Sequence, residues 1–335
     1  MSEKIKVNII KSKVPIIWLD TSIITYMTQW KNNLCKLDSV QEKRIEKLYN
    51  AIHENTRKGK LICPFAEQEL EIWCERDKWL NTIYTLSLDI KTLGFYKIHD
   101  NQFYTFAKSF INNESTVILN YTDCFFKDPA EELKERLSQK FFITLNIPLY
   151  DKDIQKNQKN ELLQGLNEQR EKNIKNKVSF KKQLEAEYLG ELQAKLIMIT
   201  QYFLGKSKNN DDSLKAIFSY MDIQYQLSIL KDITGNPNDY IDFRNFYNSS
   251  YYRAMPYTNL SSNLMAELMI SKQPIKSGDV MDISHISTIM PYSNIFITDR
   301  AWSTFLRNKK LDKLYNTIVC YIGDEQIIND FFKNI

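Results

Sequence analysis

The residues best suited to chemistry in this chain are carboxylates that follow short apolar segments. Asp20 directly follows the segment Val14–Leu19, and Asp299 ends the segment that contains Ile295–Ile297. Short apolar runs with β-branched residues predict buried strands. Because ligands bind at the carboxyl ends of strands in an open parallel sheet, we expect both aspartates to face a crevice.

Four further carboxylates stand in segments that predict helices. Asp279 and Asp282 lie three residues apart at the start of one helix, where they suit the free N–H groups and the helix dipole as well as a site. Glu67 and Glu71 lie four residues apart after the predicted strand Leu61–Pro64, on one face of a helix. A solvated acidic face explains these two glutamates as well as a binding role does.

Hydroxyl and imidazole groups accompany the carboxylates. Thr21 and Ser22 follow Asp20, and either is a candidate N-cap that would bring its hydroxyl beside that carboxylate. His285 comes one helical turn after Asp282, a spacing that fits either a packed side chain or a position near the site.

Clustered carboxylates imply a bound cation. They repel one another and raise each other's pKa unless a cation holds them. Hard oxygen ligands with open positions suit Mg²⁺ or Mn²⁺. Two such ions can hydrolyse a phosphodiester, because one lowers the pKa of the attacking water and the other stabilises the leaving oxygen. The carboxylates therefore predict a metal-dependent nuclease.

The sequence argues against several other reaction types. A phosphatase of the haloacid dehalogenase type needs a second aspartate two residues after its nucleophile, but Ser22 occupies that position after Asp20. No G-x-G-x-x-G pattern follows a strand and no G-x-x-x-x-G-K-[ST] pattern occurs, which excludes dinucleotide-binding and P-loop sites. Three histidines and five scattered cysteines disfavour a histidine-rich metal site, a zinc site and a disulfide framework.

Composition sets the broad class of the protein. A chain of 335 residues with 43% hydrophobic residues is long enough for one large domain or two smaller ones. A formal net charge of +4 permits a nucleic-acid partner without requiring one. The segment Met1–Lys13 lacks the apolar core of a secretory signal, and no run approaches the ~18 to 20 apolar residues of a membrane span. We expect a soluble, cytoplasmic protein with no membrane partner.

The elements that must position the carboxylates lie at the two ends of the chain. Strands alternate with helices in residues 14–77 and again in residues 272–335, which predicts one α/β domain with a parallel sheet, built from two parts. Residues 78–271 instead show long helical patterns and predict a large helical insertion. The clearest helices of this insertion are Glu131–Phe142, Lys181–Leu204 and Leu214–Ile233. In the two outer parts the pattern also predicts a helix over Val40–Thr56 and a last strand over Thr317–Ile322.

Two segments of the predicted insertion combine features of nucleic-acid binding. Arg253 lies among aromatic residues in Tyr251–Pro256, a segment that could stack bases and hold a phosphate, or form an ordinary tyrosine-rich loop. The basic run Arg170–Lys182 could grip a nucleic-acid backbone, or form a solvated helix face.

Four short segments resemble motifs of the PIN-like ribonuclease superfamily, and they follow its order along the chain. In particular they look like the larger bacterial PIN-like proteins with a long helical insertion. The segments are Trp18–Ser22, Ile62–Glu71, Gly278–His285 and Pro291–Arg300. The resemblance implies a parallel α/β/α sandwich whose carboxylates bind Mg²⁺ or Mn²⁺ and cut single-stranded nucleic acid, mostly RNA.

The resemblance also implies roles for single residues. Carried over by position, the ligand set would be Asp20, Glu71, Asp282 and Asp299, with Asp279 as an accessory ligand and Glu67 as the alternative to Glu71. Related sequences often carry an aspartate where this chain has Asn294, which implies a weaker set of metal ligands or one that Asp299 completes. Arg300 directly follows Asp299 in the last motif.

These observations together predict an endoribonuclease that hydrolyses single-stranded RNA at a carboxylate-bound Mg²⁺ or Mn²⁺ site. Two alternatives stay open: a PIN-like scaffold that binds RNA or a protein without cutting, and a structure-specific nuclease acting on DNA. RNA is the expected partner, and a partner protein or a homo-oligomer is compatible with the sequence. RNA turnover, a toxin system and defence against phage are all compatible roles.

Overall fold

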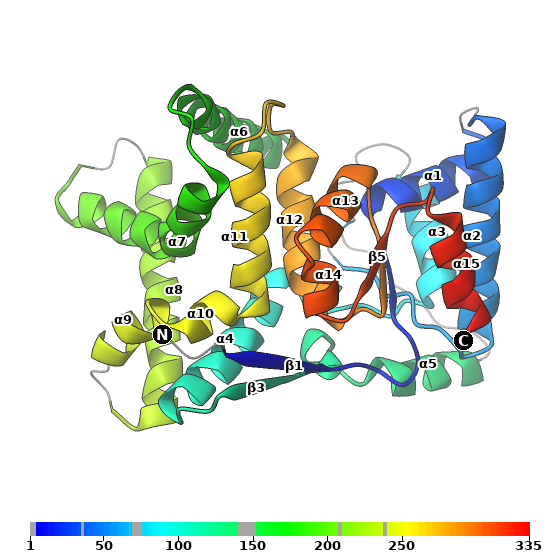
Figure 1. The fold of residues 1–335 in the computed structure, drawn as a ribbon, viewed down its shortest axis with the longest axis horizontal. Coiled ribbons are helices and arrows are strands. Elements are labelled where there is room, and N and C mark those ends of the chain that lie inside the picture. Colours follow the sequence, from blue (N-terminus) through cyan, green and yellow to red (C-terminus); the bar gives the residue numbers. More distant parts are fainter. Residues whose placement is uncertain are drawn as a thin grey trace. The chain divides into compact units, whose positions relative to one another are not determined.

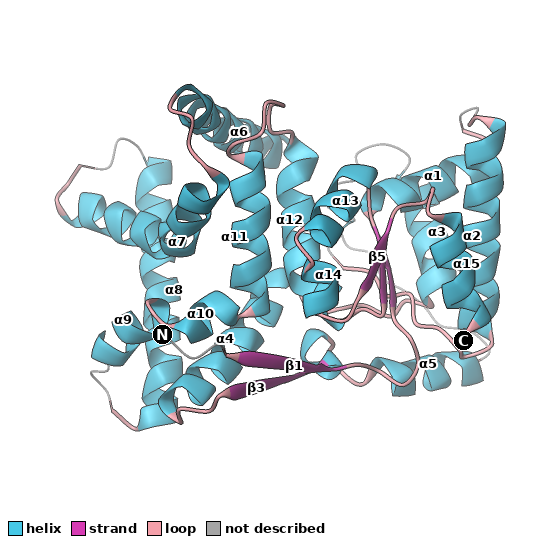
Figure 2. Cartoon of the chain, in the orientation of Figure 1, coloured by secondary structure: helices cyan, strands magenta, loops and turns pink. Residues whose placement is uncertain are grey.

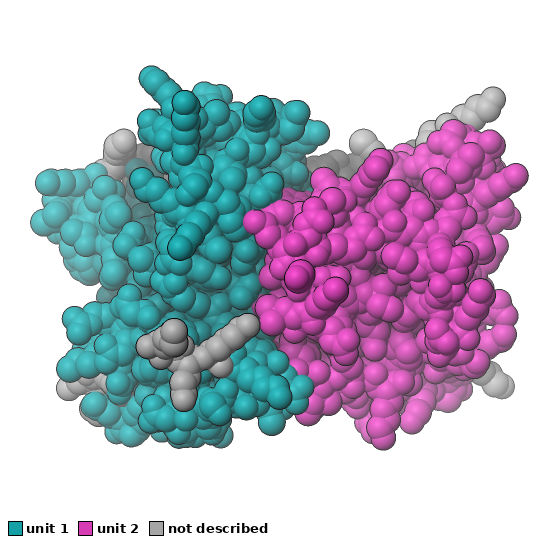
Figure 3. Space-filling view, in the orientation of Figure 1, with its two compact units in different colours: residues 1–8, 99–118, 151–283 teal, residues 9–98, 119–150, 284–335 magenta. Residues whose placement is uncertain are grey.

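The computed structural model of the protein describes residues 5–34, 37–66, 68, 76–139, 152–206, 210–236 and 240–335, with residues 152–162, 210 and 211 described by their backbone. The chain is a mixed α/β protein in which helices predominate (Figure 1, Figure 2). It divides into two compact units (Figure 3). Unit 1 comprises Met1–Asn8, His99–Ile118 and Asp151–Ile283, and unit 2 comprises Ile9–Ile98, Leu119–Tyr150 and Ser284–Ile335.

Unit 2 contains a parallel sheet of three short strands in the order β2-β4-β5. The strands are β2 (Ile17–Leu19), β4 (Ile295–Ile297) and β5 (Ile318–Cys320). Leu19 lies opposite Ile297, which lies opposite Cys320, so the carboxyl ends of the three strands are level. Every residue of β2 and β4 is buried, as the unbroken apolar runs predict for a sheet covered on both faces.

Single bridges extend this sheet on the β2 side. Ile16 pairs with Ile62 in parallel, within the predicted second strand. Phe65 then pairs with Lys91, and the neighbouring Thr92 pairs with Phe125. The segment around Ile62 is therefore the next neighbour of β2 in the sheet.

Helices of unit 2 flank the sheet. They are α1 (Thr21–Lys31), α2 (Ser39–Arg57), α3 (Arg76–Ser87), α5 (Pro129–Ser138), α13 (Arg300–Asn308), α14 (Leu311–Leu314) and α15 (Glu325–Lys333), with the 3-10 turns η2 (Tyr121–Cys124) and η3 (Met290–Tyr292). Side chains of Ile17 and Leu19 enter a core shared with α1, α2 and α3. Trp18 alternates to the opposite side of β2, where its ring contacts Phe296 and His285.

Boundaries between the two units fall within four helices and strands. They are β1 (Lys6–Ile10), α4 (Phe95–Ile111), β3 (Thr116–Asn120) and α12 (Ser277–Ile289). β1 pairs with β3 in a second, two-stranded sheet. The sequence did not predict either strand, because the alternating apolar pattern of each is short and partly exposed.

Unit 1 is built mainly from helices. They are α6 (Lys152–Lys175), α7 (Phe180–Phe203), α8 (Asn210–Thr234), α9 (Tyr240–Tyr247), α10 (Ser250–Ala254) and α11 (Pro256–Leu268). α7 packs against both α8 and α11. Rings of Phe103, Phe246, Tyr247 and Tyr252 form an aromatic cluster in the interior.

The units differ from the predicted division into residues 14–77, 78–271 and 272–335. Residues 78–98 and 119–150 belong to unit 2 rather than to a separate helical part. For residues 78–87 the reason is the apolar face of α3, where Trp79, Leu80, Ile83 and Leu86 are buried in the core shared with β2. Such packing brings a helix predicted for the insertion into the sheet-containing unit.

In the part of the chain that the structure describes, no helix combines the length and the apolar composition that crossing a bilayer demands.

Candidate functional site

Asp20 stands where β2 passes directly into α1. Its backbone N–H donates to the carbonyl of Ile297 at 2.9 Å, which fixes it beside the end of β4. Its carboxylate caps α1, since Oδ1 accepts from the N–H of Ser22 at 3.0 Å. Only 7% of Asp20 is exposed, so an ionisable group is buried at this strand end.

Asp20 itself is the N-cap, and the prediction that Thr21 or Ser22 caps the helix is wrong. Thr21 is the first helical residue and is buried, and Ser22 contributes its backbone N–H rather than its hydroxyl to the Asp20 carboxylate. The helix starts immediately after the strand, so the aspartate occupies the capping position that the hydroxyl residues were expected to fill.

Thr298 holds the second oxygen of the Asp20 carboxylate. The Thr298 hydroxyl donates to Oδ2 of Asp20 at 2.9 Å, and the Thr298 N–H donates to the carbonyl of Cys320 at 3.0 Å. Only 1% of Thr298 is exposed. A threonine between β4 and Asp299 thus orients the carboxylate of the neighbouring strand, a role that the sequence did not reveal.

Asp299 reaches the same edge from β4. It is the N-cap of α13, where Oδ1 accepts from the N–H of Trp302 at 2.8 Å, and it is half-buried. β2 and β4 are hydrogen-bonded neighbours, so the structure brings Asp20 and Asp299 together at the carboxyl edge of the sheet.

The pair has an electrostatic consequence. Burial raises the pKa of Asp20 above its ordinary value, and the charge of Asp299 adds to the rise, while the hydrogen bonds from Ser22 and Thr298 oppose it. The doubly charged form of the pair is therefore unfavourable without a nearby cation. In the described residues, no lysine or arginine forms an ion pair with Asp20 or Asp299.

Gln68 belongs to this edge, although no pattern in the sequence points to it. Its side chain is fully buried, and Nε2 donates to the carbonyl of Leu19 at 2.9 Å, at the last residue of β2. Its Oε1 accepts from the N–H of Ala66 at 2.8 Å. Glu67 and Glu71, the predicted glutamate ligands, lie outside the described residues.

Asp279 and Asp282 lie on α12, in the part that belongs to unit 1. Asp279 stands in the first turn, where Oδ2 accepts from the N–H of Lys276 at 2.7 Å, so it performs the helix-capping role. Asp282 is half-buried. Asp20 and Asp299 belong to unit 2, so a shared site with the α12 aspartates stays a prediction.

His285 is a packed side chain. Its ring lies 5.6 Å from the Trp18 ring and 5.0 Å from the Phe95 ring, between centroids, and only 2% of the residue is exposed. Burial lowers the pKa of His285 to about 3. A neutral imidazole held between aromatic rings matches the packing alternative for this residue.

Asn294 stands at the opposite end of the sheet from the aspartates. Its Oδ1 accepts from the N–H of Ile16 at 2.8 Å, and its own N–H donates to the carbonyl of Ile16 at 2.8 Å. Its carbonyl accepts from the N–H of Ile318 at 2.9 Å. The structure does not bring Asn294 to Asp20, because this side chain joins the amino ends of the strands.

Arg300 is exposed beside the carboxylate pair. Its guanidinium lies 5.8 Å from the centroid of the Tyr321 ring, which follows β5 at the same edge. Arg307 and Asp324 form an ion pair of 2.9 Å after β5. Asp324 is thus a third carboxylate beyond a strand end, which no sequence pattern indicated, but Arg307 already balances its charge.

Arg253 and Arg170, both in unit 1, already have partners. The Arg253 guanidinium lies 2.8 Å from the Glu185 carboxylate and over the Tyr188 ring at 5.1 Å. Arg170 is only 6% exposed and donates to the carbonyls of Ser271 and Lys272. The basic run Arg170–Lys182 is therefore not a uniformly solvated face.

The carboxylate pair fits a hydrated hard cation. Mg²⁺ keeps several waters and is commonly held by one or two carboxylates together with phosphate oxygens. Asp20 and Asp299 supply two such carboxylates from neighbouring strands. No group of three histidine, cysteine, aspartate or glutamate side chains placed to hold a metal occurs among the described residues.

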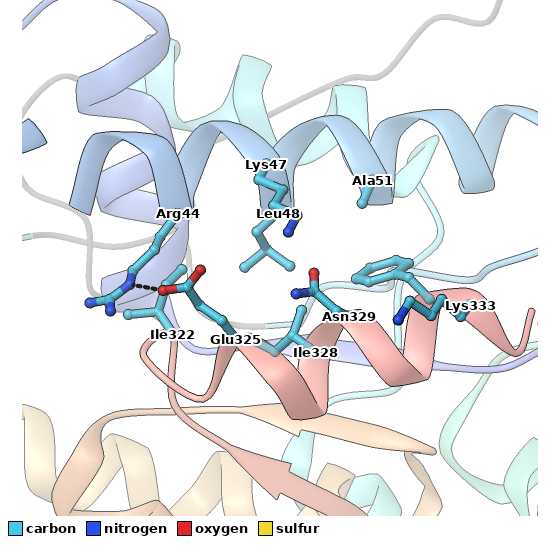
Figure 4. A pocket seen from close by; sticks show the side chains of 10 residues that line it. Arg44, Lys47, Leu48, Ala51, Ile322, Glu325, Ile328, Asn329 and Lys333 are labelled. Atoms are coloured by element: carbon cyan, nitrogen blue, oxygen red, sulfur yellow. Dashed lines mark hydrogen bonds and ion pairs between the residues drawn. The ribbon is translucent and has the colours of Figure 1, made fainter. Parts of the chain in front are cut away.

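A separate groove of about 500 Å³ lies between α2 and α15 (Figure 4). Leu48, Ile328 and Phe332 contribute its apolar surface, and the ion pair of Arg44 with Glu325 closes one end. None of the predicted site residues that the structure describes lines it. The groove is therefore distinct from the carboxylate pair.

Comparisons of the chain with protein-family models, with curated proteins and with solved structures found no match.

Proposed function

We propose that this protein is a metal-dependent endonuclease that acts on single-stranded RNA, with Asp20 and Asp299 as metal ligands from a PIN-like parallel sheet. The observation that carries the proposal is the meeting of these two carboxylates at the carboxyl ends of β2 and β4. The raised pKa of the buried Asp20 supports it, because a bound cation would offset the repulsion between the two charges.

Surrounding residues would prepare the pair for a cation. The Thr298 hydroxyl and the Ser22 N–H each hold one oxygen of Asp20 and leave further lone pairs on both oxygens. When bound, Mg²⁺ or Mn²⁺ would lower the pKa of an attacking water and stabilise the leaving oxygen. Arg300, exposed next to Asp299, is placed to hold a substrate phosphate.

The rest of the proposed ligand set comes from the resemblance to PIN-like nucleases. It consists of Glu71, with Glu67 as its alternative, and Asp282, with Asp279 as an accessory ligand. Asn294 is not part of the proposed site, because its amide joins the amino ends of the strands.

The test is cleavage of end-labelled single-stranded RNA and DNA by the purified protein in Mn²⁺, in Mg²⁺ and in EDTA. Asp299→Asn should reduce metal-dependent cleavage at least ~100-fold, because ligand charge contributes several kcal/mol to catalysis. Asp38→Asn is the matched control. Asp38 also caps a helix, α2, through its carboxylate, and asparagine caps a helix about as well as aspartate.

Each outcome separates the alternatives. The proposal is supported if RNA is cleaved only in the presence of metal, and if Asp38→Asn retains this cleavage whereas Asp299→Asn loses it. Preferred cleavage of DNA would assign the same chemistry to the other substrate. Cleavage that Asp299→Asn leaves unchanged would contradict the site, and RNA binding without any cleavage would favour a non-catalytic scaffold.

A further inference from the structure

Helices α7 and α8 of unit 1 carry large apolar side chains on their outer sides. Phe203 is 70% exposed, Leu204 is 61% exposed and Phe218 is 65% exposed. We define the apolar patch as six side chains that are each at least 48% exposed: Leu196, Phe203, Leu204, Leu214, Phe218 and Met221.

The outer side chains of α8 have the spacing of a helix–helix seam. Leu214, Phe218, Met221 and Tyr225 follow one another at intervals of four, three and four residues. This alternation keeps one stripe of a helix turned toward a neighbouring helix, as in coiled coils and bundles. The stripe therefore has the pattern of a contact surface.

The inner face of α8 already has its partners. Ala216, Ile223 and Leu230 are buried, and α8 packs against α7 and α9. α8 is thus apolar on two opposite faces, whereas a helix with one face in water normally carries polar residues on that face. The outer stripe has no helix against it within the described residues of unit 1, as the exposure of Phe218 and Met221 shows.

Ring contacts join the contributions of the two helices. Phe203 contacts Tyr202 of α7 at 5.6 Å and Tyr220 of α8 at 6.2 Å, between ring centroids. Phe203 at the end of α7 therefore adjoins the apolar side chains of the first half of α8.

The size of the apolar patch suits a stable interface. With at least 48% of each of its six side chains exposed, the patch offers on the order of 700 Å² of apolar area. The largest apolar patch on a typical monomer covers about 300 to 600 Å². Each partner in a standard protein interface contributes about 800 Å².

The charges around the patch favour a protein partner over a lipid surface. No charged residue occurs between Leu196 and Leu204, and residues 213–230 contain only Lys215 and Asp222 as charged residues. Residues 205–212, between these two stretches, carry two lysines and two aspartates, whose charges balance. Binding to an anionic membrane relies on an excess of basic residues, which this surface lacks. Exposed phenylalanine, tyrosine and methionine are instead typical of protein interfaces.

We propose that a second copy of this chain covers the apolar patch in a two-fold symmetric dimer, in which the α8 stripes of the two copies pack antiparallel. A two-fold axis between Phe218 and Met221 sets Phe218 of each copy against Met221 of the other, and Leu214 against Tyr225. Because the patch carries no charge of its own, the two copies meet without burying like charges. This association goes beyond the proposed nuclease activity and does not depend on it.

The test is the mass of the full-length chain in solution, measured by light scattering and sedimentation velocity over a range of micromolar concentrations. We expect twice the 39.7 kDa of one chain. Phe218→Glu and Met221→Glu should each raise the dimer dissociation constant at least 100-fold. Phe126→Glu is the control, because Phe126 is a 77% exposed aromatic residue of unit 2, outside the patch.

Thermal melting of each variant checks that folding is retained, which the exposure of both substituted side chains predicts. A parent chain of 39.7 kDa at all concentrations would overturn the proposal. So would a dimer that persists in both glutamate variants, because it would use another surface. Sedimentation of a monomeric parent with phosphatidylglycerol vesicles would assign the patch to lipid instead.

Discussion

Two groups of carboxylates in this protein are compensated in different ways. In unit 1, Lys195 lies between Glu191 and Asp222, with its Nζ 2.6 Å from the first carboxylate and 2.5 Å from the second. In unit 2, Asp20 and Asp299 accept hydrogen bonds from neutral donors, and no lysine or arginine of the described residues pairs with them.

The pKa values of the two groups shift in opposite directions. Partial burial acts to raise the pKa of Glu191, but the Lys195 ammonium, the neighbouring His99 and hydrogen bonds from Lys195 and Tyr252 together hold that pKa below its ordinary value. Burial raises the pKa of Asp20, and the neighbouring Asp299 charge adds to the rise. Acidic pairs in one chain can therefore differ in charge balance, because Lys195 pairs with both unit 1 carboxylates whereas no described lysine or arginine pairs with Asp20 or Asp299.

The largest expected effect on stability comes from removing the Thr298 hydroxyl that donates to Asp20. Thr298→Val should lower the free energy of unfolding by about 1.5 to 3 kcal/mol, because a buried carboxylate loses a hydrogen bond. Thr298→Ser keeps the hydroxyl and should cost less. Urea unfolding of both variants in EDTA measures the difference, and equal losses would show that the Thr298 methyl group matters rather than its hydroxyl.

A divalent cation should stabilise the protein through the Asp20 and Asp299 pair but not through the Glu191 and Asp222 pair. At ten times its dissociation constant, Mn²⁺ should stabilise the parent by about 1.4 kcal/mol, by preferential binding to the folded state. Asp299→Asn should lose this stabilisation, whereas Glu191→Gln should keep it, because Glu191 belongs to the group that has its own cation. Thermal melts with and without Mn²⁺ test this. An equal response in both variants would place the cation elsewhere.

Removing Lys195 tests how much this lysine stabilises the protein by pairing with Glu191 and Asp222. Lys195→Met should destabilise the protein by about 1 kcal/mol, a modest value because the side chains of Glu191 and Asp222 are 41% and 36% exposed. Lys58→Met is the matched control, since Lys58 pairs with Glu54 on an exposed helix face and should cost less. If urea unfolding finds equal losses of stability in the two variants, Lys195 stabilises the protein no more than a lysine in an exposed ion pair.

The pH dependence of stability should have opposite signs at the two groups. The raised pKa of Asp20 means that its contribution is present below the ordinary value of 3.8 and is lost as pH rises through the folded-state pKa. The lowered pKa of Glu191 means that its contribution is present above 4.5 and is lost as pH falls.

Unfolding of the parent, Asp20→Asn and Glu191→Gln between pH 3 and 7 in EDTA checks these signs. The stability difference between the parent and Asp20→Asn should fall as pH rises, and the difference between the parent and Glu191→Gln should grow. If both stability differences change with pH in the same direction, Asp20 and Glu191 do not differ in the way that their pKa shifts imply.

The sequence predicted the part of the candidate site that depends on neighbouring residues. The strand Ile295–Ile297 has its predicted bounds, and the predicted helices Val40–Thr56 and Lys181–Leu204 match α2 and α7 to within one residue at each end. The apolar runs before Asp20 and Asp299 were sufficient to place each aspartate at a strand end. These features follow from patterns that a short segment carries by itself.

Contacts between segments far apart in the chain could not be predicted from the sequence. Lys11 donates to the carbonyls of Pro291 and Ser293 at 2.7 and 2.6 Å, and burial lowers its pKa to about 7, yet nothing near Lys11 predicts these partners. Gln68 at the end of β2 and the hydroxyl of Thr298 on Asp20 are contacts of the same kind.

The sequence alone determined which aspartates follow strands, because strand patterns and helix caps are local. Only the tertiary structure decided that β2 and β4 are neighbours, which brings Asp20 beside Asp299, and that Asn294 lies at the opposite end of the sheet. It also decided that the outer stripe of α8 stays exposed. Strand order and burial depend on how the whole chain packs, and no short pattern specifies them.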